Sequence, residues 1–335
     1  MKIVVDAFGG DNAPTEIIKG CSLALNAHQG FKLVLTGKKE IIKELLEANP
    51  CDMGRVEIVD ARDVITNDDI PTDAIRAKTD SSLVKALEIT KTDPQCVGLV
   101  SAGSTGAVLT GAFLKIGRIR GIARPALAPE LPTVNGGKVL LIDCGANVDC
   151  KPNMLCDFAL MGDAYSKGIL KVKNPRIALL SNGTEDKKGN ELTKEAFTLL
   201  KGLPINFVGN MEARDITSGE YDVVVADGFY GNIALKASEG AVNLILKLIK
   251  NEIYSSLKNK IAGSMLKKSF DKIRKTVDFN AKGGAPFLGV EKVVIKAHGS
   301  SLAASICGSI KQAVDMHLSG LVENIKNLTD KPILE

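Results

Sequence analysis

Six short polar segments that contain glycine carry most of the side chains that could do chemistry in this 335-residue chain. Each follows an apolar run and holds Ser, Thr, Asn, Asp or His; they cover residues 8–11, 101–106, 144–147, 181–185, 227–232 and 297–301. Glycine lets a backbone approach a ligand closely, and free N–H groups at helix N-termini favour anions. A single segment of this kind more often reflects tight packing between a strand and the next helix than a binding site. Six of them favour a polar crevice suited to phosphate.

The apolar runs before these segments predict strands at 2–6, 97–100, 139–143, 177–180, 223–226 and 293–296, each leading into a helix. This alternation is typical of an α/β fold with a mainly parallel sheet, in which ligands bind at the carboxyl ends of the strands. We expect one large α/β domain over residues 1–335, which can comprise two lobes. The two glycine-rich nucleotide-binding motifs, Gly-x-Gly-x-x-Gly and Gly-x-x-x-x-Gly-Lys-Ser/Thr, do not occur in the chain.

Composition and charge exclude several classes of protein. Apolar residues make up 45% of the chain, which is too many for a disordered chain, and no run approaches the ~20 apolar residues of a membrane-spanning helix. Met1 leads directly into the first predicted strand, so we expect no signal peptide and a cytoplasmic protein. Trp is absent and Tyr occurs four times, which argues against nucleic acid as a partner. The seven cysteines form no Cys-x-x-Cys pair, so we expect no metal site and treat them as small apolar residues.

The segment 241–278 differs from the rest because it concentrates positive charge. It has nine Lys or Arg against three acids, a net charge of +6, whereas the whole chain has +4. Apolar residues recur at every fourth position from Ile245 to Met265, and 262–264 (Ala-Gly-Ser) suggests a break between two helices. One interpretation is an amphipathic pair packed on the core or on a second subunit. The other is a projecting basic hairpin that docks an acidic protein or an anionic membrane surface, with Lys258, Lys260, Lys267 and Lys268 as contacts.

These segments together resemble a known family. The matching stretches include Val-Asp-Ala-Phe-Gly-Gly-Asp-Asn-Ala-Pro at 5–14, Lys-Gly-Asn-Glu at 188–191 and Gly-Gly-Ala-Pro at 283–286, together with 101–107, 124–127, 141–149, 227–240 and 296–301. They span the chain in order. The sequence closely resembles the bacterial phosphate acyltransferases of phospholipid synthesis, which make acyl phosphate from acyl-acyl-carrier-protein and inorganic phosphate.

The resemblance implies a fold and a set of partners. The fold would be an α/β/α sandwich like that of isocitrate and isopropylmalate dehydrogenases, shared distantly with phosphotransacetylases. The protein would be a homodimer that needs no cofactor and is peripherally associated with the cytoplasmic face of the membrane. There it would supply the glycerol-3-phosphate acyltransferase.

Phosphate can attack a thioester directly, so the enzyme needs no nucleophile of its own. Positioning and preorganised hydrogen-bond donors supply much of the catalysis, and a thiol of pKa near ~8.5 leaves with little assistance. We therefore predict His298, Asn232 and Asn147 as catalytic residues; His298 would protonate the thiolate or bind phosphate. We predict Gly183, Lys188, Ser104, Thr105 and Ser300 as the phosphate site, with Lys188 as its cation. The alternatives are helix N-caps for the asparagines and Ser300, a structural role for His298, and a solvated Lys188.

Asp6, Asp143 and Asp227 each end a predicted strand. Together these carboxylates could hold a metal, but they would repel phosphate, so we expect some to orient loops by hydrogen bonding.

Two other functions compete with phosphate acyl transfer from a carrier protein. A phosphotransacetylase that uses acyl-coenzyme A would share the fold, yet a soluble donor does not call for a basic, apolar hairpin. A non-enzymatic adaptor that binds carrier protein at the membrane would leave six polar strand ends unexplained. A decarboxylating dehydrogenase is disfavoured because the nucleotide fingerprint is absent.

Overall fold

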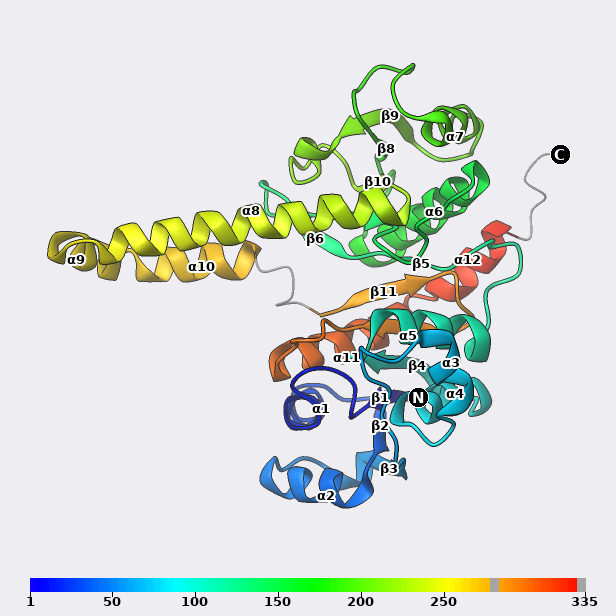
Figure 1. Ribbon diagram of the computed structural model, residues 1–335, viewed down its shortest axis with the longest axis vertical. Coiled ribbons are helices and arrows are strands. Elements are labelled where there is room, and N and C mark those ends of the chain that lie inside the picture. The colour runs from blue at the N-terminus through cyan, green and yellow to red at the C-terminus, as the bar shows by residue number, and fades with distance from the viewer. Residues whose placement is uncertain (278–282, 330–335) are drawn as a thin grey trace.

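The computed structural model describes residues 1–277 and 283–329, and it places them in two sheet-based lobes with a long helical arm (Figure 1). The larger lobe contains a seven-stranded sheet in the order β3-β2-β1-β4-β12-β11-β5, and the smaller lobe a five-stranded sheet in the order β6-β7-β10-β8-β9. All neighbouring strands are parallel except the pairs β11–β12, β11–β5 and β6–β7. The predicted α/β class with mainly parallel strands is confirmed.

In the larger lobe, helices cover both faces of the sheet. Ile17 of α1 and Ile306 of α11 pack with Val5 on one face, and Leu87 of α4 and Val108 of α5 pack on the other. The elements are β1 (Lys2–Asp6), α1 (Thr15–Ala27), β2 (Lys32–Gly37), α2 (Lys39–Ala48), β3 (Val56–Asp60), α3 (Pro71–Ala77), α4 (Ser82–Thr92), β4 (Cys96–Ser101), α5 (Thr105–Gly111), β5 (Ala126–Leu127), β11 (Ala285–Leu288), β12 (Val293–Lys296) and α11 (Ala303–Leu318).

The smaller lobe is built on the middle of the chain. Its elements are β6 (Glu130–Pro132), β7 (Lys138–Ile142), α6 (Pro152–Tyr165), β8 (Ile177–Ser181), α7 (Glu191–Lys201), β9 (Phe207–Glu212) and β10 (Val223–Val225). The last helix, α12 (Leu321–Thr329), packs against α6. One buried apolar cluster holds residues of both sheets, such as Leu33 and Leu140, so the two lobes share a core.

All six predicted strands are present, and each leads into a helix. Three of them (β1, β4 and β12) lie in the larger sheet, and three (β7, β10 and β8) lie in the smaller sheet. Within each set the strands are adjacent and parallel, so their carboxyl ends lie at one edge of their sheet.

The arm consists of α8 (Gly228–Tyr254), α9 (Leu257–Met265) and α10 (Lys267–Val277), and it projects from between the lobes (Figure 1). The predicted helix break at 262–264 is wrong, because α9 runs through it. The chain instead leaves α8 at Ser255 and Ser256, and the Ser256 hydroxyl accepts a hydrogen bond from the Asn259 N–H. Gly263 is needed for close packing, since an added Cβ would lie 2.5 Å from Ile253 Cγ2.

The apolar side chains of the arm face outward. Those with a large exposed fraction, between 36% and 83%, are Leu244, Ile245, Leu248, Ile249, Tyr254, Leu257, Ile261, Met265, Leu266 and Ile273. The core of this chain therefore does not cover the predicted stripe. Residue 278, the last of the predicted hairpin, lies outside the described residues. Among the helices that the structure describes, none has the length and apolarity to cross a membrane.

Candidate active site

A cavity of about 500 Å³ lies where the strand ends of the two lobes meet, beside the start of α8. The segments after β1, β4, β12 and β7 and the first turns of α8 line it. Its polar lining includes Asp11, Ser104, Thr105, Asn232, Lys296 and His298. Five of the six predicted polar segments therefore come together, although they belong to two different sheets.

Asp6 connects the segments after β1 and β4. Its buried carboxylate accepts a hydrogen bond from the Ser101 hydroxyl at 2.7 Å, and Ser101 Oγ accepts one from the Gly103 N–H at 3.1 Å. Burial raises the pKa of Asp6. These contacts hold the chain that presents Ser104 and Thr105 to the cavity.

Asp143 organises the turn after β7. Its buried carboxylate accepts hydrogen bonds from the backbone N–H groups of Leu127, Cys144, Ala146 and Asn147 at 2.7–3.2 Å. The Asn147 side chain adds a fifth at 2.9 Å. Burial raises the pKa of Asp143 to about 6, so the carboxylate remains ionised at neutral pH.

Asp227 caps α8 and accepts a hydrogen bond from the Tyr230 N–H at 2.8 Å. The first turn of α8 packs so closely on the smaller sheet that a Cβ at Gly231 would lie 1.9 Å from the Asp143 carbonyl oxygen. This contact sets the position of Asn232 at the cavity wall. All three predicted strand-end aspartates thus orient loops. No group of three or more potential metal ligands occurs within residues 1–277 and 283–329.

The imidazole of His298 faces the cavity in a defined hydrogen-bonding state. Its Nδ1 accepts a hydrogen bond from the Ser300 N–H at 3.2 Å and lies 2.8 Å from the Ser300 hydroxyl. Desolvation at the cavity wall, with the positive charges of Lys236 and Lys296, lowers the pKa of His298 from 6.5. At neutral pH the ring is therefore uncharged, and its Nε2–H is left to donate into the cavity.

Lys296 is a buried cation in the cavity wall, with only 7% of its surface exposed. Its ammonium group donates to the backbone oxygens of Ala102 and Ala297. Burial lowers its pKa to about 8, against the opposing charges of Asp11 and Asp6. Sequence analysis did not single out Lys296; the available signal was a lysine that closes an otherwise apolar strand, Val-Val-Ile-Lys, beside a polar turn.

The structure places four predicted site residues away from the cavity lining: Gly183, Lys188, Asn147 and Ser300. Gly183 and Lys188 follow β8, where the half-exposed Lys188 ammonium lies 3.9 Å from Glu185 Oε1. Because β8 and β10 are adjacent and parallel, this segment shares an edge of the smaller sheet with Asn232. Asn147 uses its amide hydrogens on Asp143 and on the Pro125 oxygen, at 2.9 and 2.8 Å.

The alternative that the two asparagines and Ser300 cap helices is not borne out. Lys151 and Asp227 are the N-cap residues of α6 and α8, so neither asparagine caps the helix that follows it. Helix α11 begins after Leu302, and the Glu16 carboxylate accepts a hydrogen bond from the Ala303 N–H at 2.8 Å. Ser300 instead bonds to His298. The Asn232 amide has no hydrogen-bond partner among the described residues and is available to a ligand.

Part of the cavity lining is apolar. Leu127, Pro129, Leu131 and Leu235 contribute it, and together with the polar lining they make a site for a molecule with an anionic part and a hydrocarbon part. The neutral His298 donor, the free Asn232 amide and the Lys296 ammonium can stabilise negative charge that develops on a reacting carbonyl or on a phosphate. The arrangement suits acyl transfer to an anionic acceptor.

Comparison with known proteins agrees with this chemistry. Residues 1–324 match the family model described as "Fatty acid synthesis protein". A phosphate acyltransferase from Clostridium tetani is 48% identical over 326 residues, which cover 97% of each chain. One from Clostridium novyi is 46% identical over 334 residues and covers both chains fully.

Among solved structures, a phosphotransacetylase from Streptococcus pyogenes superposes with a TM-score of 0.62 at 18% identity, covering 96% of this chain and 94% of that one. A branched-chain phosphotransacylase from Enterococcus faecalis V583 gives a TM-score of 0.56 at 16% identity, covering 95% and 99%. At these identities the likeness concerns the fold alone.

Proposed function

Because the chain belongs to the fatty acid synthesis protein family, and its two Clostridium relatives described above are phosphate acyltransferases, we propose that it transfers a fatty acyl group from acyl-acyl-carrier-protein to inorganic phosphate. The chain is an acyltransferase, so the adaptor alternative is set aside. The observation that carries the proposal is the cavity, whose lining combines hydrogen-bond donors and a buried cation with three leucines.

In this mechanism phosphate is the direct nucleophile. Ser104 and Thr105 of the cavity lining hold it, and the charge of Lys296 offsets that of the anion. Ser300 acts through His298, to which it is hydrogen-bonded. The acyl chain contacts the leucines of the lining. Nε2–H of His298 and the Asn232 amide donate to the thioester oxygen as it becomes negative. Asn147 keeps Asp143 and its turn in place and does not touch the substrate.

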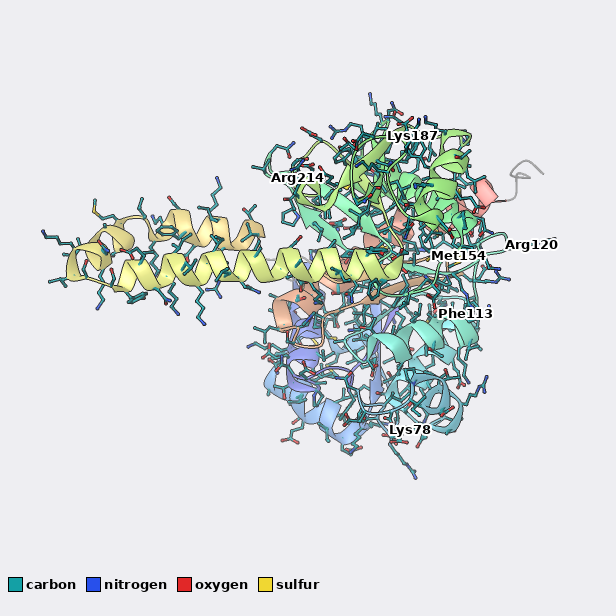
Figure 2. The ribbon with its side chains drawn as sticks, turned by 45° about the horizontal axis from the view of Figure 1, so that its top comes forward. Lys78, Phe113, Arg120, Met154, Lys187 and Arg214 are labelled. Atoms are coloured by element: carbon teal, nitrogen blue, oxygen red, sulfur yellow. The ribbon has the colours of Figure 1, made fainter. Side chains whose placement is uncertain are left out.

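We propose that Lys188 and Gly183 complete the phosphate site from the end of β8. Lys188→Ala and Asn232→Ala are each expected to lower turnover at least about tenfold with the fold intact, because each removes one donor to the anion or oxyanion. Steady-state kinetics with circular dichroism checks this. The matched control is Lys187→Ala, since Lys187 is the exposed neighbour on the outside of the smaller lobe (Figure 2). Full activity in both site variants would contradict the assignment.

We propose that the arm serves two surfaces. Phe229, Tyr230 and Ile233 at the base of α8 are half exposed, and they suit burial against a second copy in a homodimer. The tip, with exposed Lys258, Lys260, Lys267 and Lys268, suits an anionic membrane surface or the acidic carrier protein. A protein held at the cytoplasmic face of the membrane in this way would deliver acyl phosphate to the glycerol-3-phosphate acyltransferase.

Charge reversal at the tip tests this role. The double variant Lys267→Glu, Lys268→Glu is expected to weaken binding to phosphatidylglycerol vesicles or to carrier protein and to reduce its salt sensitivity, because fewer charges attract the anionic surface. Co-sedimentation across a salt series measures this. The control is Lys38→Glu, Lys39→Glu, another pair of adjacent exposed lysines, at the start of α2. Unchanged binding, with both variants still sedimenting as dimers, would contradict this role and indicate that the arm is purely structural.

A further inference from the structure

The hydrogen bonds of the Lys296 ammonium occupy only part of its capacity to donate. Its ammonium carries three N–H donors, and two of them bond to the backbone oxygens of Ala102 and Ala297. Among the described residues the structure gives the third no acceptor, and Lys296 lines the cavity that also holds the Asn232 amide. The third N–H is therefore available to an atom of the reacting group.

The hydrogen-bonding state of His298 argues against this residue as the proton donor to a leaving thiolate. His298, two residues further on, also lines the cavity, but its Nδ1 accepts from the Ser300 N–H and the ring is neutral. A neutral imidazole holds its remaining proton too tightly to protonate a thiolate. Lys296 and Lys236 are the charged donors of the described lining, and the Lys236 ammonium is paired with Glu239 at 2.7 Å, which leaves Lys296 as the acid.

We propose that Lys296 is the catalytic acid that protonates the departing thiolate of the acyl donor. This inference rests on the proposed phosphate acyl transfer. A phosphate oxygen bonds to the thioester carbonyl carbon, the C–S bond breaks with its electron pair on sulfur, and Lys296 transfers a proton to that sulfur. The acyl phosphate releases the remaining phosphate proton to water, and the neutral amine takes one from water, so protons balance.

The electrostatics of the cavity support the assignment. A pKa of about 8 for Lys296 lies close to the ~8.5 of an ordinary thiol, so the transfer is nearly balanced in free energy. Asp6 and Asp11 beside Lys296 oppose its deprotonation. The other ionisable groups in the described lining are Glu130, Cys144, Lys236, Glu239 and His298. Lys236 is paired with Glu239 at 2.7 Å, and burial raises the pKa of the Cys144 thiol well above its ordinary value.

The test compares two leaving groups and needs no variant for its first arm. With palmitoyl-acyl-carrier-protein, the kcat of the unmodified protein is expected to fall as the pH rises through 8. With the palmitoyl thioester of 4-nitrothiophenol, whose thiolate leaves without a proton, kcat is expected to stay level over that range. The same alkaline fall with both donors, or none with the carrier protein, would overturn the proposal.

The second arm uses Lys296→Arg, which keeps the charge but cannot release a proton. It is expected to lose at least about 100-fold in kcat with the carrier-protein donor. With the nitrothiophenyl donor it should stay within about fivefold of the unmodified protein. With the carrier-protein donor, the activity that remains should no longer fall as the pH rises through 8. Lys292→Arg, at the opposite end of β12, is the matched control. Equal losses with both donors would leave Lys296 only an electrostatic or structural role, whereas no acyl phosphate from the unmodified protein would refute the proposed function itself.

Discussion

Replacing His298 with alanine is expected to lower kcat for acyl phosphate formation about 100-fold while the KM for phosphate changes little. Loss of one preorganised donor to a developing oxyanion has an effect of this size. The neutral ring, fixed by the Ser300 N–H, presents Nε2–H to the cavity before the substrate binds. His317→Ala is the matched control, because His317 is exposed and lies at a separate surface pocket.

The pH dependence gives this prediction a second readout. Because the pKa of His298 is lowered, the active neutral form persists at neutral pH, and activity should fall only when the pH drops below the usual histidine value of 6.5. Protonation at Nδ1 would break the hydrogen bond from the Ser300 N–H. Dividing the profile by that of His298→Gln cancels the titration of phosphate itself. A ratio that does not fall in acid, or an alanine variant within twofold of the unmodified protein, would contradict the role.

Asp143→Ala is expected to destabilise the fold by at least about 4 kcal/mol, because four backbone N–H groups lose their acceptor in a buried site. Urea denaturation measures this. Asp143→Asn keeps one acceptor oxygen, so it should lose about half as much and provides a folded protein if the alanine variant does not fold. Asp60→Ala is the control, since the Asp60 carboxylate accepts a hydrogen bond from the Lys39 N–H at an exposed helix start and its loss should cost about 1 kcal/mol. An alanine variant as stable as this control would refute the account of the turn.

The six strand-to-helix units could be predicted because each is a local pattern, an apolar run followed by a small polar turn. The division of these units between two sheets could not be predicted in this way. It depends on long-range pairings such as β11 with β5, where Phe287 lies opposite Leu127. Sequence reasoning therefore placed the segment after β8 with the others, although Lys188 lies outside the cavity lining.

The wrong predictions for individual residues have a common cause. The sequence around Gly263 suggests a helix break, yet the missing Cβ allows close contact with Ile253, a residue ten positions away. Asn147 reads as a ligand, yet Asp143 and the Pro125 oxygen occupy its amide. Lys296 was overlooked because only the fold shows that it is buried. In each case tertiary contacts decide what the side chain does.

A product assay tests the central claim most directly. Purified protein would be mixed with palmitoyl-acyl-carrier-protein, with and without phosphate, and any acyl phosphate trapped with hydroxylamine. We predict acyl hydroxamate that depends on phosphate and is absent when palmitoyl-coenzyme A replaces the carrier protein. Product from the coenzyme A donor alone would identify a phosphotransacetylase instead, and no product from either donor would contradict phosphate acyl transfer altogether.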